Sequence, residues 1–316
     1  MRIHCVSDLL TITLEKVTTM NIKQTKRGVV LSENACYASI RVTKYAKSKT
    51  DRARSREIEI ANNASRGSVK MQTSIFSKNF DAKVTAVESE IRANHYTFTF
   101  EVPTEGGKQS RGARLLATKV AERYIGMQMD AIARYNHEAD AVVQDYEDKV
   151  EREKSRLGDL FDESKYPHPD VVRASYSADV FTDAIPSVEG INVGQYTDSQ
   201  RAKAEQRQRD AVENVTRELL ERLREGTSKI REKMDKIIVD PKGTRIHDSI
   251  FDSVRELVND VIPACNIEGS KELVTLADEV RKLTRFNTEA VRTTSSAQQA
   301  IAKEAKAIED KFNEYF

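Results

Sequence analysis

The stretch RGARLLATKVAERYIGMQMDAIARYNHEADAVVQDYEDKVEREKSRL, residues 111–157, decides the fold that this sequence predicts. Apolar side chains recur along it at steps of mostly three and four residues, which places them on one stripe of an α-helix. From residue 132 to residue 146 the steps alternate strictly between three and four, the spacing of a coiled-coil seam. We therefore expect a helix seam, within the chain or between subunits, formed by Ile132, Tyr135, Ala139, Val142 and Tyr146.

An unbroken helix over this stretch would run about 70 Å, at about 1.5 Å per residue. No proline interrupts it. Gly126, near its middle, costs only about 1 kcal/mol relative to alanine. Gly158 follows the helical pattern, where a left-handed C-terminal cap prefers glycine, and Pro167 and Pro169 prevent an immediate return to helix. The sequence thus predicts one long helix that ends near residue 157.

The composition is typical of long, partly exposed helices. Hydrophobic residues make up 39% and charged residues 32% of the 316 residues, with no tryptophan. A thin bundle carries much surface per residue of core and therefore needs more charge than a compact globule. The three scattered cysteines form no CxxC pair, and the chain has neither a signal-peptide core nor a run of ~20 apolar residues. We expect a cytoplasmic protein that does not bind membranes.

Charge is segregated along the chain, although the net charge is only +1. Residues 1–70 hold 14 Lys and Arg against 6 Asp and Glu, whereas residues 127–197 hold 7 against 15. Opposite charge of this kind indicates that the basic start and the acidic middle attract each other, within the fold or between subunits.

Short stretches of alternating apolar and polar residues indicate a small β element towards the N-terminal half. They lie at 10–15, 36–43, 95–102 and 176–180, and HYTFTFEV at 95–102 alternates most clearly. If the long helix is unbroken, the last two strands leave from its opposite ends and cannot pair directly. Either the helix bends near Gly126, or these strands belong to different sheets.

The remainder of the chain, after residue 197, is helical by its apolar periodicity. The pattern predicts a long helix over 198–238, a shorter one over about 250–262 and a last one from about 270 to 312. The predicted fold class is mainly α, an elongated bundle of long antiparallel coiled-coil-like helices with a small β element. Three regions follow: 1–110 with α+β character, 111–197 with the long helix, a Tyr-Pro corner and a short strand, and 198–316 as a helical bundle.

The sequence contains no catalytic, cofactor or metal signature. Gly106-Gly107 lacks the sequence context of the known phosphate-binding loops. The five histidines are isolated from one another, and a metal site needs at least three converging ligands. The acidic cluster at 147–153 is better explained by solvated helix charge than by paired catalytic carboxylates. We expect a protein that is not an enzyme and holds no cofactor.

One stretch supports a functional alternative. Residues 41–56 hold seven cations and one acidic residue, Asp51. Such a run could neutralise several phosphates and bind nucleic acid without sequence specificity. Only Tyr45 offers a ring for base stacking, so we favour a solvated face or an intramolecular partner for the acidic middle. The candidate nucleic-acid-binding residues are Arg41, Lys44, Lys47, Lys49, Arg52, Arg54 and Arg56.

Several short motifs between Cys36 and Val193 follow one another in a characteristic order. They are Arg114-Leu115-Leu116 after a strand that bears Thr97 and Thr99, then Leu157-Gly158-Asp159-Leu160-Phe161, Tyr166-Pro167 and Ala184-Ile185-Pro186. This order resembles a family of tailed phages and mobile elements, domain of unknown function 3150. The family usually ends that strand in tryptophan, which this chain lacks.

The resemblance implies a role but no chemistry, because no activity is established for the family. Its genes often lie near MoxR-type AAA+ ATPases and von Willebrand A-domain proteins. The resemblance therefore implies an accessory role beside such an ATPase. Together with the helical pattern, it leads us to expect a phage or mobile-element structural or adaptor protein that binds a protein partner or itself through helical faces.

Overall fold

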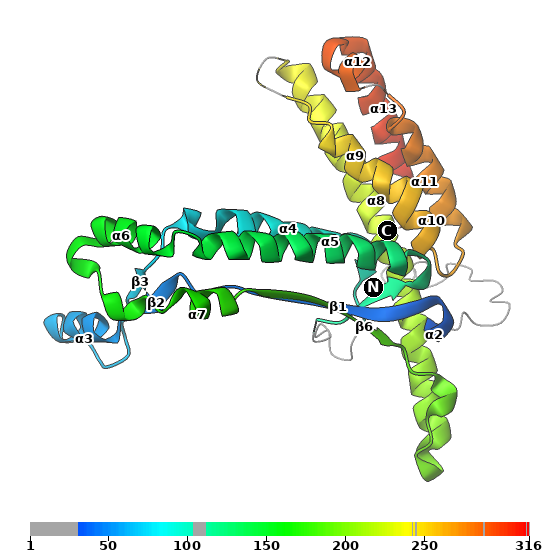
Figure 1. The fold of residues 1–316 in the computed structure, drawn as a ribbon. Helices are drawn as coiled ribbons and strands as arrows, with labels where there is room; N and C mark the ends of the chain where they lie inside the picture. The colour runs from blue at the N-terminus through cyan, green and yellow to red at the C-terminus, as the bar shows by residue number, and fades with distance from the viewer. Residues whose placement is uncertain are drawn as a thin grey trace, which may run out of the picture.

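The computed structural model describes residues 31–103 and 112–316, apart from positions 242, 244, 287, 314 and 316. The described chain is mainly helical with a small antiparallel sheet, as predicted. Figure 1 shows an arm, in which helices lie along two long strands, and a helical bundle that meets the arm at its base. The strand predicted at 10–15 lies outside the described residues.

The elements have the following bounds. The strands are β1 (Ala35–Thr43), β2 (Ser48–Thr50), β3 (Gln72–Ser74), β4 (Thr99–Phe100), β5 (Arg114–Ala117) and β6 (Ser177–Ala184). The helices of the arm and its base are α2 (Leu31–Asn34), α3 (Arg52–Ala61), α4 (Ala82–Phe98), α5 (Thr118–Val143), α6 (Tyr146–Leu157) and α7 (Pro169–Ala174). The remaining helices are α8 (Thr197–Val239), α9 (Ser249–Glu256), α10 (Ile262–Cys265), α11 (Lys271–Leu283), α12 (Thr288–Thr293) and α13 (Ser295–Phe312).

The main sheet is antiparallel in the order β4-β5-β1-β6, and β2 pairs with β3 in a separate ribbon. The long strand β1 pairs with two strands. Its first residues pair with β5, and β6 pairs with it from Cys36↔Ala184 to Thr43↔Ser177. The two strands that we expected at opposite helix ends therefore share one sheet, with β5 and β1 between them. They do not pair directly, as expected, but the alternative that they belong to different sheets was wrong.

The arm has its own core between α4, α5 and the β1–β6 ribbon. Figure 1 shows α4 and α5 on one side of that ribbon. Its buried residues include Val84 and Ile91 from α4 and Phe76 from the segment that precedes it. At the far end Tyr166 stacks on Phe161, with ring centroids 4.9 Å apart, and its hydroxyl donates to the Ile75 carbonyl oxygen at 2.7 Å. The Tyr-Pro corner thus closes this core where the chain turns back.

The predicted long helix is interrupted, but not at Gly126. Helix α5 ends at Val143, and α6 begins after Asp145, which takes a left-handed φ of 53°. Aspartate tolerates this conformation better than most residues. Lys149 then donates to the carbonyl oxygens of Ala141 and Val142, at 3.0 and 2.6 Å, which satisfies acceptors left free at the helix end.

The strand predicted at 95–102 is mostly helix. Helix α4 continues to Phe98, and only Thr99 and Phe100 extend into β4. Ile91, His95 and Phe98 share a helical face and are all buried. The apolar alternation arises because helix changes to strand between two buried phenylalanines, Phe98 and Phe100. The packing of that helical face on the core overrides the local preference of aromatic and threonine residues for strands.

The C-terminal helices form a bundle in which α13 packs against α8 and α11 (Figure 1). The single helix predicted from 270 to 312 is divided into α11, α12 and α13, so that the chain reverses and α13 returns along α8. Gly226 permits a close approach of α8 to α9, because a Cβ at this position would lie 2.9 Å from Cγ2 of Val254. None of the described helices is long and apolar enough to span a membrane.

The N-terminal third of α8 continues past the sheet, away from the bundle (Figure 1). None of the described residues 197–210 is buried, and the first buried positions of α8 are Ala211 and Val212. Alanine is the only apolar residue type in this stretch. About 20 Å of polar helix therefore projects from the body, at about 1.5 Å per residue.

Candidate interaction surfaces

The five seam residues, Ile132, Tyr135, Ala139, Val142 and Tyr146, are all buried and pack within the chain. They belong to the arm core, together with residues of α4, α7 and β6. Tyr135 is fully buried, and its hydroxyl donates to the Thr43 carbonyl oxygen at 2.6 Å. The seam continues from Val142 to Tyr146 across the helix break. Because it is covered by other parts of the same chain, it offers no free face for a partner.

The basic run lies along the arm and does not form one helix or loop. Arg41 belongs to β1, Lys49 to β2, and the last three arginines of the run to α3, while Lys44 and Lys47 lie in the connections between these elements. Figure 1 shows α3 at the far end of the arm. The seven cations are therefore spread over several elements.

Most cations of the run are neutralised by carboxylates of the chain itself. Nitrogen–oxygen distances are 3.5 Å for Arg41–Asp179, 2.6 Å for Lys44–Glu88, 2.5 Å for Lys47–Asp81, 3.9 Å for Arg54–Asp51 and 3.2 Å for Arg56–Glu59. Lys49 instead lies over the Tyr45 ring, 5.1 Å from its centroid. Only Asp179 among these five carboxylates belongs to the acidic middle. The positive charge of the run is thus neutralised mainly by carboxylates that lie outside the acidic middle of the chain.

A cleft of about 700 Å³ opens beside the run, between the β1–β2 connection and the Tyr-Pro corner. Lys44, Lys49 and Lys165 line it, together with Tyr45 and Pro167. Lys165 is held at 3.1 Å from the carboxylate of Asp51, whose pKa is lowered by the Arg54 backbone N–H and by Lys165. Two of these lysines, Lys44 and Lys165, therefore share their charge with nearby carboxylates, which weakens the attraction of the cleft for a free anion.

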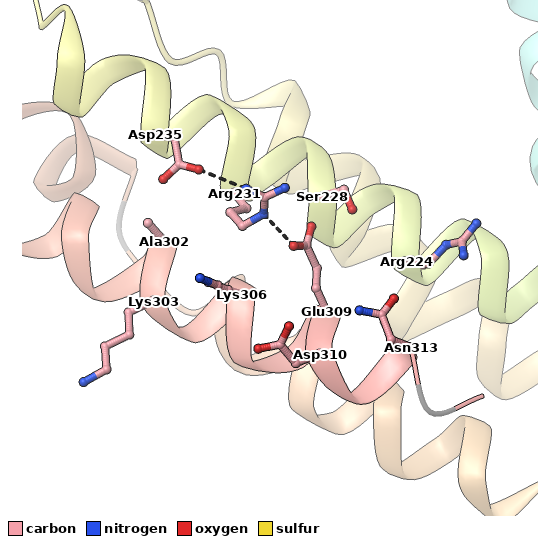
Figure 2. A pocket seen from close by; sticks show the side chains of 10 residues that line it. All are labelled: Arg224, Ser228, Arg231, Asp235, Ala302, Lys303, Lys306, Glu309, Asp310 and Asn313. Atoms are coloured by element: carbon pink, nitrogen blue, oxygen red, sulfur yellow. Dashed lines mark hydrogen bonds and ion pairs between the residues drawn. The ribbon is translucent and has the colours of Figure 1, made fainter. Parts of the chain in front are cut away.

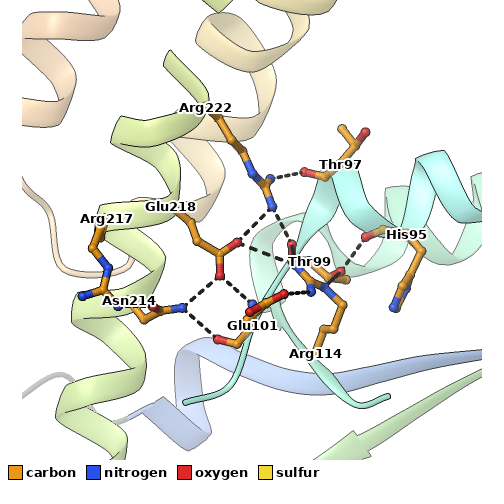
Figure 3. A network of polar contacts seen from close by, with 9 residues as sticks. All are labelled: His95, Thr97, Thr99, Glu101, Arg114, Asn214, Arg217, Glu218 and Arg222. Carbon is orange, nitrogen blue, oxygen red and sulfur yellow. Dashed lines mark hydrogen bonds and ion pairs between the residues drawn. The ribbon is translucent and has the colours of Figure 1, made fainter. Parts of the chain in front are cut away.

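A polar junction joins the bundle to the arm, and no sequence signal pointed to it. Arg222 of α8 donates to the carbonyl oxygens of Thr97 and Thr99, both at 2.9 Å (Figure 3). Its guanidinium lies 4.6 Å from the ring centroid of Phe100. Burial lowers the pKa of Arg222 from its ordinary value, but a guanidinium remains charged in proteins. The junction thus holds a permanent, half-buried cation.

Glu218, one turn before Arg222, supplies the compensating charge. Its carboxylate accepts from the Glu101 backbone N–H at 2.8 Å and from the Asn214 amide at 2.9 Å. It also lies 3.3 Å from Arg222 and 3.6 Å from Arg114. Several charge-assisted bonds between α8 and the β4–β5 end therefore set the angle between bundle and arm. In sequence, Glu218 and Arg222 resemble an ordinary exposed i,i+4 pair.

A second cleft, of about 660 Å³, lies between α8 and α13 (Figure 2). Arg231 points into it and pairs with Glu309 at 2.5 Å and with Asp235 at 3.1 Å. Lys303 and Asp310 also line the cleft. Because cations and carboxylates alternate around it, the cleft has no marked preference for a charged ligand.

Two titratable side chains of the arm, His95 and Tyr124, contact each other in the interior of the protein. His95 is buried, and its Nδ1 lies 2.7 Å from the hydroxyl oxygen of Tyr124. Burial, reinforced by nearby arginines, lowers the pKa of His95 to about 4, and burial raises the pKa of Tyr124 to about 12. Both are neutral at neutral pH. No group of three or more His, Cys, Asp or Glu side chains could hold a metal ion within the described part of the chain.

Comparison of the chain with protein-family models, with curated proteins and with solved structures gave no match.

Proposed function

We propose that this chain is a non-enzymatic structural or adaptor protein of a phage or mobile element, which binds a protein partner or a second copy through a helical face. It acts in the cytoplasm of the bacterial host. The observation that carries the proposal is the projecting part of α8, residues 197–210, where no side chain is buried. A helix that is polar all round needs internal ion pairs or a partner to remain ordered. Here Arg209 pairs with Glu205, and Arg201 donates to the carbonyl oxygens of Glu189 and Ile191, which leaves much of the polar surface for a partner.

The projecting segment keeps the register of the buried stripe of α8. Its half-buried positions include Ala204 and Gln208, which lead into the buried Ala211 and Val215 at steps of three and four. Small and polar residues at such spacing suit a coiled-coil-like contact with another helix. The elongated, coiled-coil-like assembly expected from the sequence is therefore proposed for this segment and its partner.

The polar junction supports an adaptor role in a second way. Arg222 and Glu218 hold α8 at a defined angle to the arm. A surface carried on a rigid element loses less conformational entropy on binding than one carried on a loop. The projecting helix is thus presented in one orientation relative to the arm.

The order of motifs that resembles domain of unknown function 3150 suggests who the partner is. We propose that it is a MoxR-type AAA+ ATPase or a von Willebrand A-domain protein encoded nearby. Genes of that family often lie near genes for these two classes of protein.

Affinity capture from native cells tests the proposal. The tagged full chain should retain an AAA+ ATPase or A-domain protein, or a second copy of itself. A variant with Ala204→Arg and Gln208→Arg should retain at least about tenfold less, because two bulky cations would occupy the contact stripe. The matched control is Ala202→Arg, on the exposed side of the same helix. Equal capture by all three chains, or a monomer that captures neither partner class, contradicts the proposal.

Nucleic-acid binding by the run 41–56 remains the alternative function. The observation in its favour is that Lys49 and Arg52 form no ion pair with any described residue. The variant with Lys49→Glu and Arg52→Glu leaves the internal ion pairs of the run intact. If the alternative holds, the native chain shifts DNA or RNA at low salt, loses affinity steeply as salt rises, and loses it in this variant. Salt-sensitive binding abolished in this way would replace the adaptor proposal.

A further inference from the structure

Strand β6 forms one edge of the main sheet. Among the described residues it pairs only with β1, over all eight of its positions. Alternate residues of such a strand direct their N–H and C=O groups away from the sheet. An edge of this length can accept a further strand, from the same chain or from another.

The two faces of β6 differ in chemistry. Ala178 is buried and Val180 packs on the core, so that these residues face α4 and α5. The opposite face carries Asp179, Phe181 and Asp183 in alternation, and Phe181 is 44% exposed. This pattern of acid, aromatic ring and acid lies next to the edge of β6 that pairs with no described strand, which we call the free edge.

We propose that the free edge of β6 binds an extended peptide segment of a partner protein in which basic, apolar and basic side chains alternate. A strand added to this edge would place every second side chain beside Asp179, Phe181 and Asp183. Opposite charges and apolar side chains at neighbouring positions of paired strands stabilise the pairing. The inference concerns a sheet edge and does not depend on the helical contact proposed for α8.

A second copy of this chain fits the edge poorly. An antiparallel β6 pair that brings the two Phe181 rings together would also set Asp179 of one chain opposite Asp183 of the other. Like charges at directly opposite positions destabilise paired strands. The neighbouring Arg41 of β1, 5.5 Å from the Phe181 ring centroid and 3.5 Å from Asp179, already shows the chemistry that this face attracts.

The test uses the full chain and the fluorescent peptide Gly-Lys-Thr-Leu-Thr-Lys-Gly, followed by fluorescence anisotropy. Binding should weaken at least about tenfold when the order of the same residues is scrambled. Two further peptides are N-methylated on alternate residues, one on both threonines and one on both lysines and the leucine. Only the peptide edge that faces β6 needs its N–H groups, so one methylated peptide should bind and the other should not.

A charge exchange completes the test. The variant with Asp179→Lys and Asp183→Lys should lose the lysine peptide and bind a version with glutamate in its place. A milder variant with Asp179→Asn and Asp183→Asn removes the negative charges without reversing them, so it is less prone to misfold. Circular dichroism checks that both variants are folded. The proposal is overturned if the native chain binds no peptide, if both methylated peptides bind as tightly as the parent, or if preference does not follow the exchanged charges. Those outcomes would mean that the aspartates only protect the edge from pairing.

Discussion

Nδ1 of His95 lies 2.7 Å from the hydroxyl oxygen of Tyr124, and this contact joins α4 to α5 inside the molecule. Because burial keeps the imidazole neutral, with a pKa of about 4, the folded chain binds this proton less readily than the unfolded chain, in which the pKa is about 6.5. The burial of His95 therefore makes stability depend on pH.

We predict that stability falls as pH drops below about 6.5, and that the His95 contribution is fully lost near pH 4. The unfolded chain gains a proton in this range and the folded chain does not, which costs about 3 kcal/mol in total. Urea unfolding of the native chain and of His95→Gln at pH 7 and pH 4.5 measures it. Carboxylates change stability in both chains, so the difference isolates the histidine. Parallel pH dependences would show that His95 is accessible to protons when folded.

Replacing Arg222 with methionine should destabilise the chain by about 1–3 kcal/mol. The change removes the Arg222 donor from the Thr97 carbonyl oxygen, whereas Glu218 and the Thr99 carbonyl oxygen keep Arg114 as a partner. Chemical denaturation measures the loss, and Lys203→Met, an exposed position on the same helix, should change stability by less than about 0.5 kcal/mol. Similar small effects for both variants would mean that the junction is open to water.

The paired change Ile132→Asp and Val142→Asp should unfold the arm, at a cost of several kcal/mol, because each buries an uncompensated charge. Since the seam is covered within the chain, we expect lower thermal stability and not the dissociation of an oligomer. Met129→Asp on the exposed side of α5 is the control. Unchanged melting in the double variant would reject the burial of the seam.

Two neighbouring lysines of the basic run should respond differently to charge reversal. Lys47→Glu places a second carboxylate beside Asp81, whose side chain is fully buried, and should cost about 3–5 kcal/mol. Lys49→Glu removes only a contact over the Tyr45 ring and should cost about 0.5–1 kcal/mol. Thermal denaturation of the two single variants compares them. An equal effect would mean that the ion pair of Lys47 is not part of the stable fold.

Much of the architecture follows from periodicity, which is a local property of the sequence. The alternation at 36–43 predicted β1, and the spacing of apolar residues after 198 predicted α8. The five seam positions are all buried, because a stripe of apolar side chains must be covered by some surface. The two surfaces proposed to bind partners could not be predicted from the sequence, because neither the exposed part of α8 nor the edge of β6 carries a recognisable motif.

Only the tertiary structure decided where these elements end, which strands pair and which charges neutralise one another. Residues 95–98 alternate like a strand, yet they are helical because Ile91, His95 and Phe98 pack on one face. The seven cations read as a candidate phosphate-binding run, yet five have a carboxylate of the same chain within 4 Å. Periodicity depends on neighbours in sequence, whereas the burial of a face and the partner of a charge depend on residues brought close only by folding.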